Sequence, residues 1–134
     1  MYFLDTTFIV GLFVSNEQWH PEAIGIYKKI KNNRLLISKL VIAETVTVLK
    51  NKLPTKDIRE IYNNIPHIFE VIDDSESYDG AMNEFIKYDS NISFFDSMYV
   101  HIMKEKNISE IVSFDSDFDR VNGIIRLHWL PILL

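Results

Sequence analysis

Residues 110–119, "EIVSFDSDFD", join a short apolar run to three aspartates at alternating positions, Asp115, Asp117 and Asp119. The apolar part is rich in branched and aromatic residues, which is typical of a buried strand. Carboxylates this close in sequence repel one another, and each raises the proton affinity of the others. The cluster that follows this strand is therefore either screened by water or arranged to hold a cation.

The same kind of apolar stretch recurs along the chain, and the predicted strands are residues 2–4, 35–37, 69–72, 111–114 and 124–129. Longer stretches with helical periodicity lie between them. Strands that alternate with helices pair in parallel through right-handed crossovers, so we expect a sheet covered on both faces. The segment 38–53, "SKLVIAETVTVLKNKL", is long for a strand and follows a possible N-cap at Ser38, so it is predicted to be a helix. We predict one α/β domain over residues 1–134.

Composition excludes several classes of protein. The chain has no cysteine, which excludes disulfides, thiolate zinc sites and cysteine nucleophiles and fits a reducing compartment. The apolar N-terminus, "MYFLDTTFIVGLFV", and the tail "LHWLPILL" are both shorter than the roughly 20 residues that a membrane span needs. We therefore expect a cytoplasmic protein without a membrane segment.

The charge is unevenly distributed. A net charge of −5 argues against a protein that wraps duplex nucleic acid through phosphate contacts. Residues 28–52, however, hold seven lysines and arginines and only one acid, Glu44. This segment is either a helical face exposed to solvent or a basic surface beside a functional carboxylate, Glu44.

Carboxylates also follow other predicted strands and open predicted helices. Asp5 ends the first strand, Glu44 lies on the helix that follows strand 35–37, and Asp96 is near the start of the helix in "ISFFDSMYVHIMKEK". Asp5 and Asp96 each have a simpler interpretation, as residues that favour a helix start. In parallel α/β sheets, however, functional groups gather at the carboxyl ends of the strands. We therefore expect these acids to meet Asp115 and Asp117 in one cleft.

Carboxylates without cysteine or histidine beside them are hard oxygen ligands, which suit Mg²⁺ or Mn²⁺. Such an ion stabilises charge on a phosphodiester and acidifies water. A calcium loop beginning at Asp115 is excluded, because its sixth and twelfth positions are Arg120 and Arg126. The four histidines lie in different segments and are interpreted as structural.

The order of the motifs "FLDTT", "IAETVTVL", "ISFFDSMYV" and "IVSFDSDFD" resembles the PIN domain, and within it the VapC-type toxin ribonucleases, over residues 1 to about 130. The resemblance implies a three-layer fold, with a five-stranded parallel sheet between helices. It also implies Mg²⁺- or Mn²⁺-dependent cleavage of single-stranded RNA by a homodimer that a small antitoxin protein neutralises.

The resemblance assigns roles to individual residues. Its metal-binding acids fall on Asp5, Glu44, Asp96 and Asp115, with Asp117 as an auxiliary ligand. Small hydroxyl positions near that site fall on Thr7 and Ser93. The basic segment could supply phosphate contacts to RNA, through Arg34, Lys39, Lys50 and Lys52.

Two other classes of function remain open from the sequence. A phosphatase that forms an aspartyl phosphate usually has a second Asp two residues beyond the nucleophile, where this chain has Thr7. A receiver-like binding module without turnover would use an acidic pair such as Asp73 and Asp74, which follow a middle strand rather than the first. A metal-dependent endoribonuclease acting as a toxin is therefore the leading prediction.

Overall fold

A computed structural model describes residues 1–129, so the last five residues of the predicted domain, 130–134, lie outside the described part. The chain order alternates strands and helices. The elements are β1 (Tyr2–Leu4), α1 (Thr6–Phe13), α2 (His20–Ile30), β2 (Leu35–Ser38), α3 (Lys39–Leu49), α4 (Thr55–Ile68), β3 (Glu70–Ile72), α5 (Tyr78–Lys87), α6 (Phe94–Glu105), β4 (Glu110–Val112), a 3₁₀ turn η1 (Ser116–Arg120) and β5 (Ile125–Leu127).

The five strands form one parallel sheet in the order β3-β2-β1-β4-β5, which confirms the predicted fold class. The first strand lies at the centre, where Phe3 pairs with Leu36 on one side and with Ile111 on the other. All five predicted strands are present. β4 ends at Val112, two residues earlier than predicted, because the N–H of Phe114 donates to the Thr7 hydroxyl instead of continuing the ladder. The central position of β1 brings the segments after β1 and β4 together at one edge.

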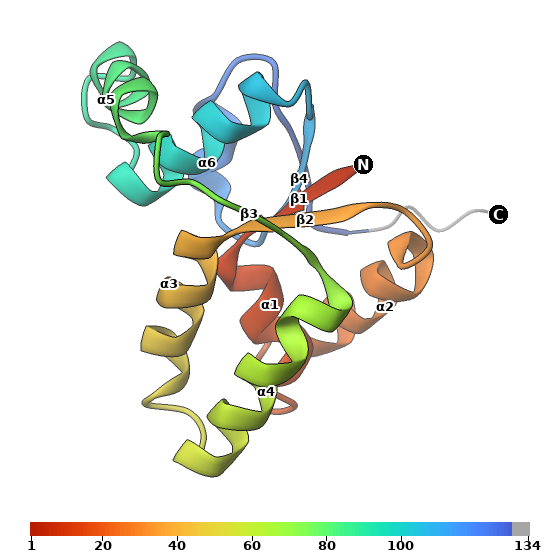
Figure 1. The fold of residues 1–134 in the computed structure, drawn as a ribbon. Helices are drawn as coiled ribbons and strands as arrows, with labels where there is room; N and C mark the ends of the chain where they lie inside the picture. Colours follow the sequence, from red (N-terminus) through yellow and green to blue (C-terminus); the bar gives the residue numbers. More distant parts are fainter. Residues whose placement is uncertain (130–134) are drawn as a thin grey trace, which may run out of the picture.

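Helices cover both faces of the sheet (Figure 1). Helices α1 to α4 lie on one face, and α5 and α6 pack together on the other (Figure 1). The predicted helix in residues 38–53 is α3, which ends at Leu49. The three-layer arrangement follows from the topology. The chain crosses to the second face after β3, when α5 and α6 carry it past β1 to β4.

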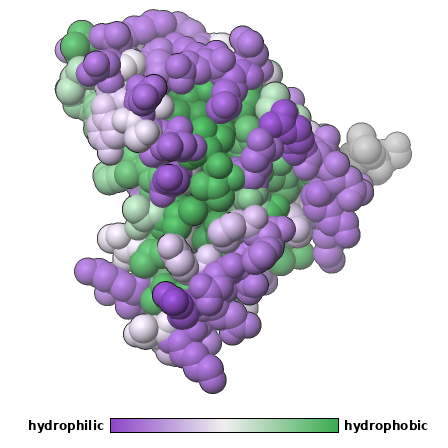
Figure 2. All heavy atoms as spheres, viewed as in Figure 1, coloured by the Kyte–Doolittle hydropathy of each residue, from purple (hydrophilic) through white to green (hydrophobic). Residues whose placement is uncertain are grey.

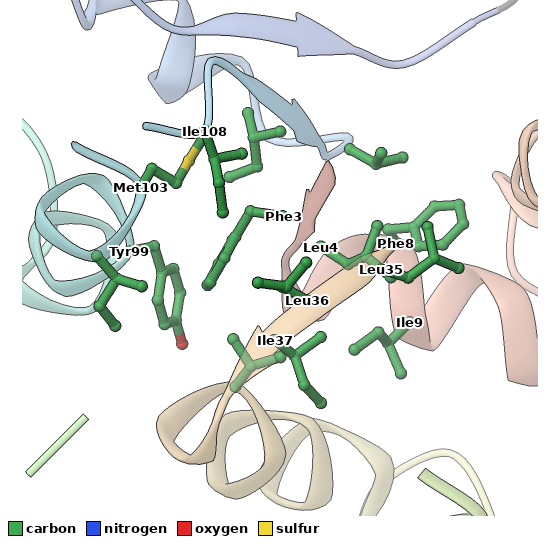
Figure 3. Close-up of a cluster of buried hydrophobic side chains, with 14 of the residues drawn as sticks. Phe3, Leu4, Phe8, Ile9, Leu35, Leu36, Ile37, Tyr99, Met103 and Ile108 are labelled. Atoms are coloured by element: carbon green, nitrogen blue, oxygen red, sulfur yellow. The ribbon is translucent and has the colours of Figure 1, made fainter. Parts of the chain in front are cut away.

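The core fills the space between the sheet and each helical layer. Figure 3 shows Tyr99 and Met103 of α6 on one side of Phe3, while Phe8 and Ile9 of α1 lie on the other side of the sheet. These five side chains are fully buried. The rings of Phe3 and Tyr99 pack at a tilt of 37°, with 5.5 Å between centroids. Because α6 is anchored in this way, its first turn is fixed relative to the end of β1.

Side-chain caps begin the elements that follow several strands. Asp5 accepts from the N–H of Phe8 at 3.1 Å and caps α1, and Ser38 accepts from the N–H of Val41 and caps α3. Asp115 caps the η1 turn in the same way. Such caps satisfy N–H groups that have no partner within the helix. They also hold the capping residues at the carboxyl edge of the sheet.

The surface between α3 and α4 is apolar. Figure 2 shows hydrophobic side chains across this face, with hydrophilic ones above and below. A groove here is lined mostly by apolar side chains, including Ile42, Val46, Tyr62 and Val71, with Lys39 at its rim. Within residues 1–129, no helix is long and apolar enough to cross a membrane.

Candidate metal centre

Three carboxylates converge at the carboxyl edge of the sheet. Oxygens of Asp96, Asp115 and Asp117 all lie within 4.8 Å of one another, which is close enough for one cation to contact all three. Asp96 is in the first turn of α6, and Asp115 and Asp117 follow β4. Asp96 is buried, and the other two are half-buried.

Asp5 lies beside this cluster at the end of β1 and is 4% exposed. Its Oδ2 accepts a 2.6 Å hydrogen bond from the Ser113 hydroxyl, and its Oδ1 accepts a 2.7 Å hydrogen bond from the Thr7 hydroxyl. Burial raises the pKa of Asp5 to about 6, although these hydrogen bonds act in the opposite direction. The negative charge of Asp115 raises the pKa of Asp5 further, because the two carboxylates repel each other.

Glu44 approaches from α3 and is half-buried. Its Oε1 accepts two hydrogen bonds, one from the Thr6 hydroxyl at 2.7 Å and one from the Tyr99 hydroxyl at 2.9 Å. In Figure 3 the hydroxyl oxygen of Tyr99 points toward α3, while its ring stays in the core. Burial and the neighbouring Glu44 raise the pKa of Tyr99 well above its usual range, so the phenol remains a donor. Two donors on one oxygen fix the orientation of the Glu44 carboxylate.

Asp96 shows that the four predicted metal ligands share one electrostatic environment. Its pKa is raised to about 8, first by burial and then by the charges of Asp115, Asp5 and Glu44. Ser93 caps α6 by accepting from the N–H of Asp96 at 3.0 Å, and this bond sets where the Asp96 side chain leaves the helix. All of the acids predicted from the sequence therefore come together.

The residues fit a hard divalent cation. Every nearby ligand candidate is a carboxylate, and buried carboxylates that raise one another's proton affinity gain from a positive charge. Asp96, Asp115 and Asp117 form the tightest group, and Asp5 and Glu44 flank it. Such a centre can neutralise a phosphodiester and activate water.

Hydroxyl groups connect the segments at this edge. The Thr7 hydroxyl donates to Asp5 and accepts from the N–H of Phe114 at 2.9 Å, while Ser113 accepts from the N–H of Asp115 at 2.9 Å. The sequence suggested Thr7 but missed Thr6, Ser113 and Tyr99. Tyr99 was detectable in part, because it lies three residues after Asp96 on the same helical face. Thr6 and Ser113 had no signal as partners of the acids, because the bond from Thr6 to Glu44 spans 38 residues and the bond from Ser113 to Asp5 spans 108.

Asp119 is not part of the group formed by Asp96, Asp115 and Asp117. It forms two hydrogen bonds with the guanidinium of Arg126, at 2.9 and 3.0 Å, and this contact lowers the pKa of Asp119. Arg126 also donates to the carbonyl of Ser113 at 3.2 Å. Of the three alternating aspartates, two therefore join the centre, and the third holds the strand end through Arg126.

The predicted RNA-binding cations are spread over the fold. Arg34 precedes β2, so it lies at the amino ends of the strands, whereas the carboxylates lie at the carboxyl ends. It binds Glu70 on the surface, so the structure does not bring Arg34 to the carboxylates. Lys39 is exposed, 4.0 Å from Asp73, and Lys50 directly follows α3. Lys52 pairs with Glu17 and lines a pocket beside Thr7. Of the four predicted cations, Lys52 is the one that shares a pocket with Thr7, a residue bonded to Asp5.

Comparisons with known proteins agree with this architecture. The VapC20 toxin of Mycobacterium tuberculosis, which cleaves the sarcin–ricin loop, has a TM-score of 0.81 at 21% identity over 89% of this chain and 93% of that protein. VapBC2 of Rickettsia felis, bound to a promoter DNA fragment, has a TM-score of 0.76 at 16% identity over 96% and 98%. DNA-bound VapBC of Salmonella typhimurium has a TM-score of 0.71 at 16% identity, with the same coverage.

These likenesses confirm the fold, and no curated protein sequence gives a significant match. The PIN domain family model matches residues 2–124, which include β1, all six α-helices, β4 and the carboxylates of the centre. The resemblance of the four sequence motifs to that family is confirmed by this match. The chain therefore belongs to the PIN domain family.

Proposed function

We propose that this protein is a metal-dependent endoribonuclease that cleaves single-stranded RNA as the toxin of a toxin–antitoxin pair. The observation that carries the proposal is the convergence of Asp5, Glu44, Asp96 and Asp115 at the carboxyl edge of a PIN-family sheet. The likeness to VapC20, a toxin that cleaves the sarcin–ricin loop, supports this activity over other metal-dependent hydrolases.

Mg²⁺ or Mn²⁺ is the proposed cofactor, because the donors are all carboxylate oxygens. Asp96, Asp115 and Asp117 would hold it, with Asp5 and Glu44 completing the ligand set. When bound, the ion would supply charge neutralisation for the phosphodiester and acidification of the attacking water.

Hydrogen bonds from neighbouring hydroxyl groups orient the carboxylates of this centre. Thr6 and Tyr99 hold one oxygen of Glu44, so the other oxygen faces a defined direction. Thr7 and Ser113 each bind one oxygen of Asp5 and oppose the effect of burial on its pKa. With its pKa near 8, the Asp96 carboxyl holds a proton at neutral pH that it must release when it becomes a ligand.

Single-stranded RNA is the proposed substrate because a carboxylate centre needs a strand flexible enough to place one phosphate against it. The net charge of −5 means that phosphate contacts must come from local cations. Lys39, Lys50 and Lys52 are the proposed contacts, and Arg34 is left out because Glu70 binds it at the opposite edge.

The test is cleavage of a hairpin RNA by purified protein with Mg²⁺ or Mn²⁺. We expect cuts in the unpaired loop that leave 5′-phosphate and 3′-hydroxyl ends, and we expect Asp115→Asn or a chelator to abolish them. Asp119→Asn is the matched control, because Asp119 binds Arg126 instead of joining the cluster. Products with a 2′,3′-cyclic phosphate, or cutting that survives chelation, would contradict the mechanism.

A small antitoxin protein and a second copy of the chain are the proposed partners. The likeness to two VapBC assemblies bound to DNA supports the first. The apolar groove between α3 and α4 supports protein contact in general, because exposed apolar surface of this kind marks interaction sites. The product of a small adjacent gene should inhibit the cleavage at a fixed stoichiometry. Light scattering of the protein alone should give twice the monomer mass of 15.7 kDa.

The receiver-like alternative gains no support from the acidic pair after β3. Asp74 is buried and accepts a 2.8 Å hydrogen bond from the N–H of Leu40, which tethers the start of α3. Asp73 accepts from the N–H of Ser75 and lies near Lys39. Both residues therefore have structural partners.

A further inference from the structure

An aromatic pair lies directly beside the carboxylate centre. The indole of Trp19 and the ring of Phe114 are nearly parallel, with 10° between their planes and 5.3 Å between centroids. Trp19 precedes α2 and is 42% exposed, whereas Phe114 is half-buried and adjoins Asp115. We call Trp19 and Phe114 the aromatic shelf. An exposed tryptophan held flat against a second ring presents a rigid open face.

The shelf is tied to the centre by two hydrogen bonds. The N–H of Phe114 donates to the Thr7 hydroxyl at 2.9 Å, and that hydroxyl donates to Asp5 at 2.7 Å. A pocket of about 230 Å³ opens between the shelf and Thr7, and Lys52 contributes to its wall. This volume is below the roughly 300–1,000 Å³ of pockets for drug-sized ligands, so it suits a single flat group beside a phosphate.

Several contacts hold the shelf in place. The ring of His20 bonds the carbonyl of Gly11 through Nδ1 at 2.8 Å, which fixes the residue next to Trp19. A side chain at Gly11 would crowd the aromatic shelf, because its Cβ would lie 3.3 Å from the Phe114 ring. The ion pair between Glu17 and Lys52 ties the segment before Trp19 to the chain just after α3. The open indole face is therefore built into the fold.

We propose that the aromatic shelf is a base-binding subsite, which stacks one unpaired nucleobase next to the phosphate that is cut. This rests on the proposed function. Stacking on an aromatic face needs an unpaired base and tolerates any base identity, so the shelf selects strand conformation more than sequence. Lys52 lines the same pocket, where it pairs with Glu17. The shelf thus gives this acidic protein a means of holding RNA that does not depend on net charge.

Kinetics of RNA cleavage test the shelf. Trp19→Leu should raise KM about tenfold and leave kcat within about twofold, because stacking of one base by an aromatic side chain is worth roughly a 5- to 150-fold change in affinity. Trp19→Phe should restore most of the loss. Trp129→Leu is the matched control, since Trp129 is also exposed, at 56%, and lies after β5. Equal effects of the two leucine substitutions on KM would overturn the proposal.

A second measurement separates the shelf from the catalytic activity. In a Trp129→Phe protein, Trp19 is the only tryptophan, and a short single-stranded RNA with chelator present should quench its emission. A duplex of the same sequence should leave the Trp19 emission unchanged, because its bases are already stacked on one another. Cleavage without quenching would contradict base binding by the aromatic shelf but leave the proposed nuclease activity standing. Quenching without cleavage would support the shelf and count against the nuclease, and absence of both would overturn both.

The nucleotide that occupies the shelf can be found with abasic RNA. Removing the base at each loop position in turn should raise KM sharply at one position next to the cut. At that position Trp19→Leu should add nothing further, because the two changes remove the same contact. Additive effects at every position would overturn the assignment of a base to the shelf.

Discussion

The hydroxyl of Ser113 donates a 2.6 Å hydrogen bond to Oδ2 of Asp5, and this contact joins the ends of β4 and β1 across 108 residues of sequence. The same serine oxygen accepts from the N–H of Asp115. Ser113 is fully buried, so its hydroxyl has no water to replace either partner. One small side chain therefore fixes the distance between two of the proposed metal ligands.

Ser113→Ala should destabilise the protein by about 1–3 kcal/mol, because it leaves a buried carboxylate without one of its donors. It should also raise the pKa of Asp5 further, since the Ser113 bond opposes the effect of burial. Urea denaturation measures the first effect. Thr47→Ala is the control, because the Thr47 hydroxyl bonds only an exposed helix carbonyl. A loss no larger than that of Thr47→Ala would contradict the prediction.

The metal-free protein should become less stable as the pH rises from about 4 to about 8. Asp5 and Asp96 have a usual pKa of 3.8 but keep their protons in the folded state up to about pH 6 and 8. The folded state thus binds more protons than the unfolded chain across this range, so the free energy of unfolding falls with increasing pH. Denaturation with chelator at pH 5 and pH 8 measures the slope.

Asp96→Asn should flatten this slope and stabilise the metal-free protein at pH 8, since it removes a buried charge among like charges. Asp5→Asn should not stabilise to the same extent, because Asp5 accepts three hydrogen bonds and caps α1. Asp119→Asn is the control: its pKa is lowered from 3.8, so Asp119 is largely ionised in both states between pH 5 and pH 8. A slope unchanged in Asp96→Asn would show that Asp96 is already ionised at pH 5.

Tyr99→Phe should weaken Mn²⁺ binding by about tenfold while the fold is retained. The ring against Phe3 is preserved, and only the hydroxyl that orients Glu44 is lost. Removal of groups that orient metal ligands typically costs about 10- to 100-fold in affinity. Calorimetry measures the affinity, with the exposed Tyr62→Phe as a control. Equal affinities for the two variants would mean that Glu44 is oriented without Tyr99 or is not a ligand.

Gly80→Ala should destabilise the protein by roughly 1–3 kcal/mol, because a Cβ at Gly80 would clash with the ring of His101, so the ring or the packing of α5 against α6 must shift. Gly25→Ala is the matched control. Gly25 is also helical, and a Cβ there would meet nothing within 4 Å, so this change should stabilise by about 0.5–1 kcal/mol. Thermal melts measure the stability of both variants. A stabilised Gly80→Ala protein would show that His101 moves aside without cost.

Local patterns in the sequence were sufficient for the elements of the fold. The five strands are short apolar runs, and the helices between them begin at caps such as Ser38, so both could be predicted from neighbouring residues. The position of Asp5 and Asp115 directly after strands was also enough to predict that these two acids would meet, because the carboxyl ends of parallel strands lie together.

Only the tertiary structure decided what each polar side chain binds. Asp117 joins the carboxylate group while Asp119, two residues later, turns to Arg126, and nothing in the alternating pattern distinguished them. Arg34 belongs to the basic segment in sequence but lies at the edge of the sheet opposite the carboxylates. The hydrogen bonds from Ser113 to Asp5 and from Tyr99 to Glu44 span 108 and 55 residues. Such contacts depend on strand order and on the helix crossings that create it, and neighbouring residues in the chain carry no information about either.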